Sequence, residues 1–293
     1  MASEGDRRPD LEVEARRSRL LGGLSLEAEG ARGVAIALIS TAVFLTVVIV
    51  AISQSPGWPE VHRVFFSWDD IRSTFPDIAR AFVLNVKIFL VCEVFILVFA
   101  LVIAVLRSLP GPVFFPLRAL AIIYTDLARG IPTILVIALL GFGAPALQLQ
   151  GVPTSRVFWA GVGLVLIYSG YVAEVYRAGI ESVHPSQDAA ARSLGLSRFQ
   201  ALRFVILPQA VRRVIPPLLN DFIGLQKDTA LVGTLGVIDA FNQAQIDANS
   251  TFTFGSYLAA AVLFVAITIP LARFTDVLIA RDRRRRQASG VFA

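Results

Sequence analysis

The stretch Glu181-Ser-Val-His-Pro-Ser-Gln-Asp-Ala-Ala-Ala-Arg-Ser-Leu-Gly-Leu-Ser197 lies between two long apolar segments. It is polar and rich in alanine, which favours a helix. Ser186 is suited to cap the start of that helix, and Asp188 follows in the first turn, where the helix dipole favours negative charge. Gly195 is suited to end it. The stretch therefore predicts a short capped helix in a water-exposed loop.

A second helix start follows directly. Ser197-Arg-Phe-Gln200 has the spacing of a capping box, in which a serine and a glutamine side chain each bond the other residue's backbone N–H. Phe199, Leu202 and Phe204 then form an apolar stripe. The loop thus predicts two short helices in succession.

The chain as a whole is too apolar for an ordinary soluble domain. Of its 293 residues 55% are hydrophobic and 17% charged, against about 45–50% and about 25% in soluble domains. A hydrocarbon core of about 30 Å requires about 20 apolar residues per span. We therefore expect an all-α polytopic membrane protein with about six transmembrane helices. The expected spans are residues 33–52, 81–106, 113–142 (interrupted near Gly130 and Pro132), 157–177, 204–235 and 255–279.

The polar segments between the spans predict the organisation of the chain. Ser67 is expected to cap a short surface helix in the segment before the second span. The expected parts are a cytoplasmic tail at 1–32, a first transmembrane helix at 33–52, an extracytoplasmic segment at 53–80, a transmembrane core at 81–279 that contains a loop at 181–203, and a basic cytoplasmic tail at 280–293.

The distribution of basic residues predicts the orientation. If both termini are cytoplasmic, the inside segments hold 19 Lys and Arg residues and the outside segments hold four. Cytoplasmic loops carry the excess of Lys and Arg in membrane proteins. We therefore expect both ends of the chain in the cytoplasm.

The sequence lacks the residues that nucleotide or metal chemistry would need. No Gly-x-x-x-x-Gly-Lys phosphate loop occurs, and the only lysines are Lys87 and Lys227. His62 and His184 lie far apart in the expected topology, which argues against a metal site. The single cysteine, Cys92, lies in an apolar run. We expect no enzymatic activity and no cofactor on this chain.

Ionisable residues inside spans are costly and mark either pathways or structural ion pairs. Asp126 and Arg129 are three residues apart, so that they can pair on one helix face or line a pathway. Asn220, Lys227 and Asp228 are spaced seven or eight residues apart, which places them on one face of the fifth span.

This set of side chains has two interpretations. A Lys–Asp pair with an Asn amide offers an acceptor for the ammonium and a donor for the carboxylate of a zwitterion. Alternatively, Lys227 and Asp228 only neutralise each other. Glu93, with Lys87 and Asn85, belongs to the same channel or to a seam between subunits.

Several motifs resemble a known family. The run Gly170-Tyr-Val-Ala-Glu-Val-Tyr-Arg-Ala-Gly-Ile180, the Ala190-Ala191-x-x-x-Gly195 pattern and Leu207-Pro208 look like the signature loop of binding-protein-dependent ABC importer permeases. Asn220, Lys227-Asp-Thr-Ala-Leu231 and Gly233-Thr-Leu-Gly236 are similar to the polar amino-acid subfamily, the histidine/glutamine-type permeases. The resemblance covers about residues 65 to 279, so the first span is an addition to the family's five-helix core.

The resemblance implies a transmembrane subunit of an ATP-driven importer of polar amino acids in a bacterial cell membrane. Two ATP-binding subunits would bind ATP and Mg, so this chain would carry no cofactor. The other implied partners are a second permease subunit, the same or related, an extracytoplasmic solute-binding protein, the lipid bilayer and the polar amino-acid substrate, with no nucleic acid.

The resemblance also assigns candidate site residues. The coupling helix that contacts the ATPase would contain Ser186, Asp188, Ala189, Ala190, Ala191 and Gly195. The translocation pathway candidates are Asp126, Arg129, Asn220, Lys227, Asp228 and Glu93. The family usually has Glu at the position of Ala189, and Asp188 is the candidate replacement for it.

Two other classes of protein remain as alternatives. An ion-coupled secondary amino-acid transporter would use Asp126, Glu93 or Asp228 as the ion carrier. A membrane scaffold would use the loop only to recruit proteins. The sequence leaves open which amino acid is carried, whether the permease is a homodimer or a heterodimer, and what the first 52 residues do.

Overall fold

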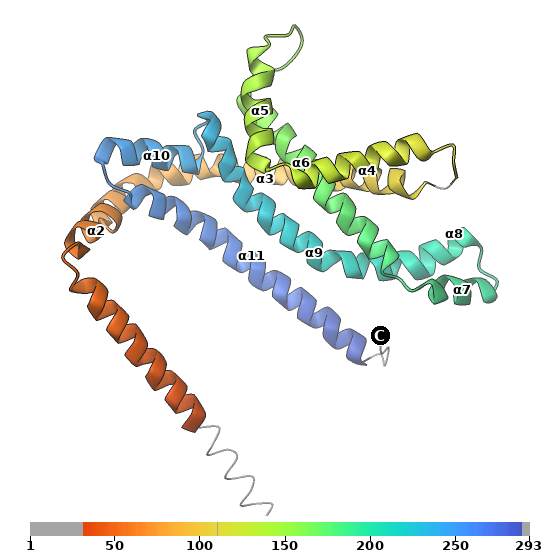
Figure 1. Ribbon diagram of the computed structural model, residues 1–293, viewed down its shortest axis with the longest axis horizontal. Helices are drawn as coiled ribbons and strands as arrows, with labels where there is room; N and C mark the ends of the chain where they lie inside the picture. The colour runs from red at the N-terminus through yellow and green to blue at the C-terminus, as the bar shows by residue number, and fades with distance from the viewer. Residues whose placement is uncertain (1–31, 110, 289–293) are drawn as a thin grey trace, which may run out of the picture. The chain divides into compact units, whose positions relative to one another are not determined.

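Every regular element that the structure describes is a helix. The structure is a computed structural model that describes residues 32–109 and 111–288, with side chains up to residue 281. The chain forms two compact units, Met1–His62 and Arg63–Ala293, each described by itself (Figure 1). The predicted tail at 1–32 lies almost wholly outside the described residues, as does the end of the tail predicted at 280–293.

The first described helix is Arg32–Ser53. The elements that come after it are α2 (Trp58–Phe65), α3 (Trp68–Ser108), α4 (Phe115–Gly130), α5 (Thr133–Ala146), α6 (Arg156–Glu181), α7 (Pro185–Ser193), α8 (Arg198–Ala201), the π-helical turn η1 (Leu202–Ile206), α9 (Leu207–Asp228), the 3₁₀ helix η2 (Thr229–Leu235), α10 (Ala240–Thr251) and α11 (Gly255–Ala288).

The prediction of an all-helical polytopic membrane protein is confirmed, although fewer spans qualify than the six expected. In the described part of the chain four helical segments are long and apolar enough to cross a membrane, or five if the bent pair α4 and α5 counts as one span. The four segments are Arg32–Ser53, Trp58–Ser108, Arg156–Glu181 and Gly255–Arg281. The segment expected at 204–235 is not among them. Its helix α9 contains Arg212, Arg213, Asn220, Asp221, Lys227 and Asp228.

The break predicted near Gly130 and Pro132 is confirmed. Helix α4 ends at Gly130 and α5 begins at Thr133, with a bend of 101° between them. Ile131 has extended backbone angles (φ −95°, ψ 130°) because a residue before proline is disfavoured in the helical region. Pro132 has no N–H to continue the helix.

Ser67 caps a longer helix than the sequence predicts. Its hydroxyl accepts the Asp70 N–H (3.5 Å), as expected of an N-cap. The helix that starts there is α3 itself, which runs for 41 residues to Ser108. The separate short helix expected at Ser67 is therefore wrong, because the apolar run continues the capped first turns without a stop signal.

The chain from Arg198 to Leu235 is one uninterrupted succession of helical turns. Pro208 has no N–H, and its ring crowds the preceding turn of helix. The turn before it, η1, is wider than an α-helical turn. The Leu207 N–H bonds the Leu202 carbonyl, five residues back, which is the π-helical spacing. The wider turn lets the chain pass Pro208 without ending the helix.

Helix α6 lies at the centre of the second unit and packs against α3, α4, α5 and α9 (Figure 1). Its crossing with α9 is close. A Cβ atom on Gly179 would lie 2.4 Å from Cγ2 of Val214 in α9, a distance that real Cβ atoms do not show. A side chain at position 179 would therefore push the two helices apart.

A buried hydrogen-bonded cluster joins α3, η2 and α10. The Asn85 amide donates to Asp239 Oδ2 (2.9 Å) and Thr229 Oγ1 (3.4 Å), and its oxygen accepts the Ala240 N–H (3.1 Å). Asp239 also caps α10 by accepting the Asn242 N–H (2.8 Å). Burial raises the pKa of Asp239, and its hydrogen bonds from Asn242 and Asn85 oppose that shift. Such buried polar groups are stable only when they are fully paired.

We predict that Asp239→Ala lowers the free energy of unfolding by about 2–4 kcal/mol, because it leaves the Asn242 N–H unpaired and the Asn85 amide with only its longer bond to Thr229. Thermal unfolding of the purified chain in detergent measures the effect. Asp276→Ala, which removes an exposed ion pair with Arg273, should change stability by less than about 1 kcal/mol. Equal effects of the two substitutions would contradict the structural role of the cluster.

Candidate functional site

Helix α7 begins with a cap that sequence reasoning missed. The His184 ring Nδ1 accepts the Ser186 N–H (3.2 Å), so His184 is the N-cap and Pro185 the first helical residue. Proline suits that position because its missing N–H would have no partner there. The prediction that Ser186 is the cap is therefore wrong. Its hydroxyl instead lies 2.7 Å from His184 Nδ1.

The end of α7 agrees with the prediction. Gly195 has φ +86°, the left-handed conformation that glycine adopts without a penalty. The Gly195 N–H bonds the Arg192 carbonyl (3.0 Å), and the Leu196 N–H bonds the Ala191 carbonyl (3.2 Å). These two bonds define a Schellman motif. Gly195 thus turns the chain so that α8 can start three residues later, at Arg198.

The predicted capping box at the start of α8 is confirmed, with both reciprocal bonds between Ser197 and Gln200 present. The turn between α7 and α8 and the start of the second helix expose large apolar side chains: Leu194 is 84% exposed, Phe199 68% and Phe204 63%. Large exposed apolar groups that lie together are typical of interaction surfaces.

The predicted coupling residues do not all face outward. Ser186, Ala189 and Ala190 are exposed, Asp188 is half-buried, and Ala191 is buried against the rest of the loop. Ala191 therefore packs α7 onto the molecule, whereas the exposed positions form its outer surface.

Two side chains of α9 hold the loop against the bundle. The Arg213 guanidinium donates to the Ser182 carbonyl at the end of α6. The Gln209 amide donates to Gln187 Oε1 in α7 (3.3 Å). The first bond holds the end of α6 against α9, and the second holds α7 against α9. The link of α7 to α6 is the short connection between the two helices. A displacement of α7 therefore acts on two membrane helices at once.

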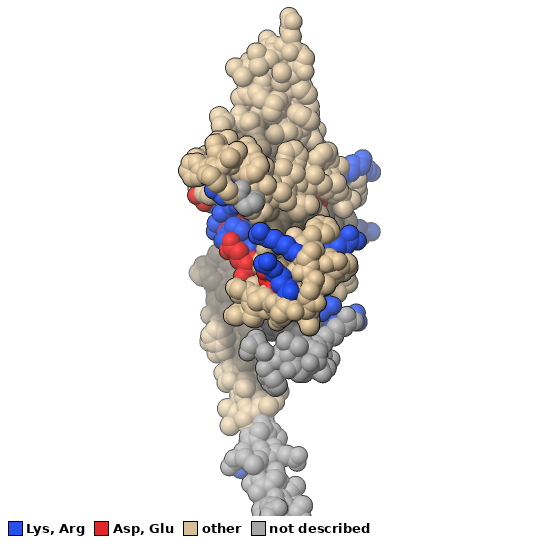
Figure 2. Space-filling view, turned by 90° about the vertical axis from the view of Figure 1, so that its right-hand side faces the viewer, with Lys and Arg blue, Asp and Glu red and all other residues tan. Residues whose placement is uncertain are grey.

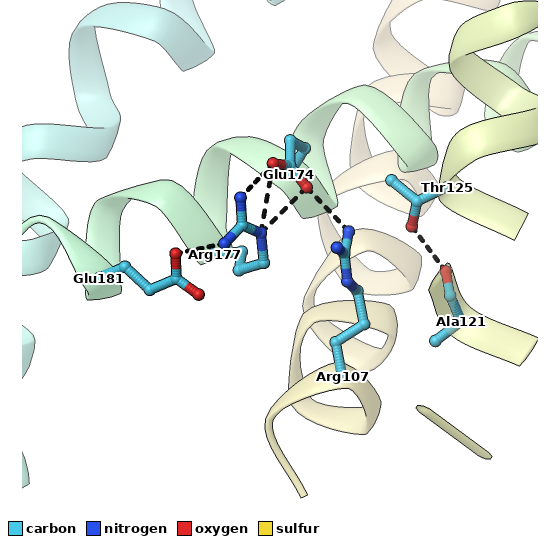
Figure 3. Close-up of polar contacts among 6 residues, drawn as sticks. All are labelled: Arg107, Ala121, Thr125, Glu174, Arg177 and Glu181. Atoms are coloured by element: carbon cyan, nitrogen blue, oxygen red, sulfur yellow. Dashed lines mark hydrogen bonds and ion pairs between the residues drawn. The ribbon is translucent and has the colours of Figure 1, made fainter. Parts of the chain in front are cut away.

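An ionic network lies at the same end of α6 (Figure 3). Glu174 accepts from Arg107 of α3 (2.8 Å) and from Arg177, one turn further along α6. Arg177 also pairs with Glu181 at the last turn of the helix. Figure 2, which views the molecule from the side that carries α7 and α8, shows basic and acidic side chains gathered there. The network joins the end of α3 to the end of α6.

The pathway candidates are not brought into one group. Asp126 and Arg129 are both exposed, and among the described residues no ion pair joins them. Asn220 and Lys227 are exposed as well. Asp228 is half-buried and accepts a hydrogen bond from the Tyr168 hydroxyl (2.9 Å).

Glu93, the remaining candidate, is half-buried in α3 and lies near Asp221 of α9. The structure therefore places Glu93 inside the helix bundle of the second unit rather than beside Lys227.

Sequence reasoning missed several partners because they lie far apart in the chain. Tyr168 and Asp228 are 60 residues apart, and Asn85 and Asp239 are 154 apart. Thr229 lies in the quoted Lys-Asp-Thr motif, yet it is buried in the cluster with Asn85. Only the helix-cap pattern at Asp239, with Ala-Phe-Asn directly after it, gave a local signal.

The fold defines an all-helical, multi-pass membrane protein. Residues 111–284 match the family of binding-protein-dependent transport system inner membrane components. The chain belongs to this family and is a multi-pass protein of the inner membrane. In these systems the ATPase is a separate subunit, so the permease itself carries no nucleotide.

Individual relatives agree with this assignment. The chain is 34% identical over 211 residues to the probable amino-acid permease protein YxeN of Bacillus subtilis, covering 72% of this chain and 93% of that protein. It is 40% identical over 164 residues to the probable glutamine ABC transporter permease protein GlnM of the same organism, covering 55% and 73%. A crystal structure of an amino acid ABC transporter with histidines has a TM-score of 0.64 at 28% identity, covering 70% of this chain and 94% of that chain.

We predict that Glu174→Gln lowers the free energy of unfolding by about 1–3 kcal/mol, because Arg107 loses its only described carboxylate partner and two arginines are left close together. Asp77→Asn removes an exposed ion pair with Arg80 and should cost at most about 1 kcal/mol. Thermal unfolding in detergent compares the two.

A double-mutant cycle gives the sharper test. If Glu174 acts through Arg107, then Arg107→Gln in the Glu174→Gln background should add little further loss. Strictly additive losses would show that the two side chains are energetically independent.

Proposed function

We propose that this chain is the transmembrane subunit of an ATP-driven importer of polar amino acids, which an extracytoplasmic solute-binding protein delivers. Membership of the binding-protein-dependent family supports the class of transporter. The names of YxeN and GlnM, amino-acid and glutamine permeases, support the substrate class. So does the solved amino acid transporter, which is aligned over 94% of its chain.

We further propose that α7 is the helix that contacts the ATP-binding subunit. The observation that carries this proposal is its attachment: α7 is closed by a cap at each end, it follows α6 after only three residues, and its Gln187 bonds Gln209 of α9. Its outer surface offers Ala189 and Ala190, with the exposed side chain of Leu194 beside them. Small and apolar groups of this kind fit into a groove of a partner.

The mechanism derives from that attachment. Closure of two ATPase subunits would draw two such helices together, one from each permease subunit. Since α7 is bonded to α9 and follows α6 after three residues, both membrane helices would move with it, and the cavity would turn from one side of the membrane to the other. A reversal of populations from 1:99 to 99:1 needs about 5.5 kcal/mol of differential binding.

Asp188 is proposed to take the role of the glutamate that the family resemblance leads us to expect at position 189. It lies in the first turn of α7, where the positive end of the helix dipole stabilises a carboxylate. It is half-buried, so its charge acts on the start of α7 as well as on a docked partner.

The translocation pathway is proposed to pass the exposed polar groups Asp126, Arg129, Asn220 and Lys227, with Glu93 and Asp228 more deeply placed. Charged groups on the surface of a membrane helix need water or a partner. A zwitterionic substrate needs both an acceptor and a donor, which these side chains provide. Both chain termini are proposed to be cytoplasmic, because the Lys and Arg excess lies on that side.

We predict that Gly195→Val abolishes most ATPase association and uptake. A β-branched residue is strained at φ +86°, and the strain of about 1–3 kcal/mol would displace α8. Gly195→Asn is the matched control, because asparagine tolerates this conformation. No heavy atom lies within 4 Å of a Cβ at this position, so membrane insertion should be normal for both. Co-purification of the ATPase and uptake in vesicles measure the outcome, and normal uptake by Gly195→Val would refute the coupling role.

A second prediction concerns the exposed apolar groups. Leu194→Ser combined with Phe199→Ser should weaken ATPase binding at least about tenfold, since buried apolar anchors contribute most of an interface's energy. Leu149→Ser, an exposed position in the loop before α6, should leave binding unchanged. Uptake that persists without any ATPase but stops with an uncoupler would instead support an ion-coupled transporter.

A further inference from the structure

A groove of about 460 Å³ lies on the surface between α3 and α6. Its lining is almost entirely carbon, and among the described residues that line it Lys87 is the only charged one. The lining includes Lys87, Val91, Phe95 and Phe99 of α3, and Val162 and Val165 of α6. Volumes of about 300–1,000 Å³ are typical of sites for small molecules.

The position of Lys87 along α3 places it at the level of the lipid headgroups. Lys87 and Arg107 are 20 residues apart in this helix, which corresponds to about 30 Å at about 1.5 Å per residue. That length equals the thickness of the hydrocarbon core. Arg107 lies in the ionic network at one end of α3. Lys87 therefore lies at the opposite interface, and not inside the membrane as the span predicted at 81–106 implied. Its side chain leans toward that interface because helical side chains tilt toward the N-terminus.

The groove extends from Lys87 toward the middle of the membrane. Phe99 lies 12 residues further along α3, about 18 Å away, and half of a 30 Å hydrocarbon core is about 15 Å. Val91, Phe95 and Phe99 are each more than half exposed along this path. The groove thus has a cation at headgroup level. Its apolar lining extends about as far along α3 as the hydrocarbon part of one leaflet is thick.

We propose that this groove binds one anionic phospholipid, with its phosphate at the Lys87 ammonium and an acyl chain along Val91, Phe95 and Phe99. No carboxylate pairs with Lys87 in the described part of the chain. A protein helix packed over the groove would bury that ammonium in a dry apolar seam, which is costly without a partner. A lipid leaves the charge at the interface and supplies the anion, and it is a ligand distinct from the imported amino acid.

The test counts lipids on the purified protein. The full-length permease with its co-purifying subunits is incubated in mixed micelles that contain phosphatidylglycerol or phosphatidylcholine with the same acyl chains, and native mass spectrometry records the bound lipid. The wild type should retain phosphatidylglycerol roughly fivefold better, as expected for one lysine at an anionic surface. Lys87→Gln should remove that preference, and Lys87→Arg should restore it.

Two further variants separate the groove from a general effect. Val162→Trp fills the groove from α6 at a half-buried position, and it should lose the retained lipid of both headgroups. Lys227→Gln removes the chain's other lysine and should retain lipid as the wild type does. Retention of lipid by Val162→Trp, loss of preference in Lys227→Gln, or no retained lipid in the wild type would overturn the proposal. None of these readouts depends on uptake or on the ATPase.

Discussion

The close crossing of α6 and α9 at Gly179 determines where α7 lies. A Cβ on Gly179 would lie 2.4 Å from Cγ2 of Val214, so the two helices lie too close together for a side chain at this position. Only Ser182, Val183 and His184 separate α6 from α7, and the first of these is held by Arg213 of α9. Because the connection is this short and Gln187 of α7 bonds Gln209 of α9, a displacement of α7 acts on the helix pair. A force on the surface helix α7 is thereby transmitted to the membrane helices α6 and α9.

The far end of the same helical succession is fixed by a different kind of contact. From Arg198 the chain runs through α9 into η2, where Thr229 meets Asn85 of α3 and the cap of α10. Buried polar groups of this kind are strong only when fully paired, and they favour a single arrangement over many. The ionic network at Glu174 fixes α3 to α6 at the opposite end. A displacement of α7 therefore acts on helices that are bonded to α3 at two places, at Asn85 and at Arg107.

Local patterns predicted the local structure well. The capping box at Ser197, the stop at Gly195 and the break near Pro132 each depend on neighbouring residues, and all three are confirmed. The cap of α7 was predicted incorrectly, because Pro185 shifts the helix start by forcing His184 into an extended conformation. Fewer spans qualify than the six expected, because the segment at 204–235 has the length of a span but its helix α9 carries several charged side chains. Contacts between distant segments, such as Asn85 with Asp239, leave no periodicity in a single sequence.

The polar contacts change character along the bundle. At the end of α6 the pairs are ionic, because partial exposure to solvent lowers the cost of keeping Glu174 and Arg107 charged. Nearer the middle of α6, the neutral hydroxyl of Tyr168 donates a hydrogen bond to Asp228 of α9. A bilayer offers neither water nor counter-ion, so an exposed charge such as Lys227 or Arg129 is tolerated only beside a water-filled cavity or another subunit. The exposed charges of the described chain therefore mark surfaces that lipid does not cover, whereas Lys87, at headgroup level, does not need such a surface.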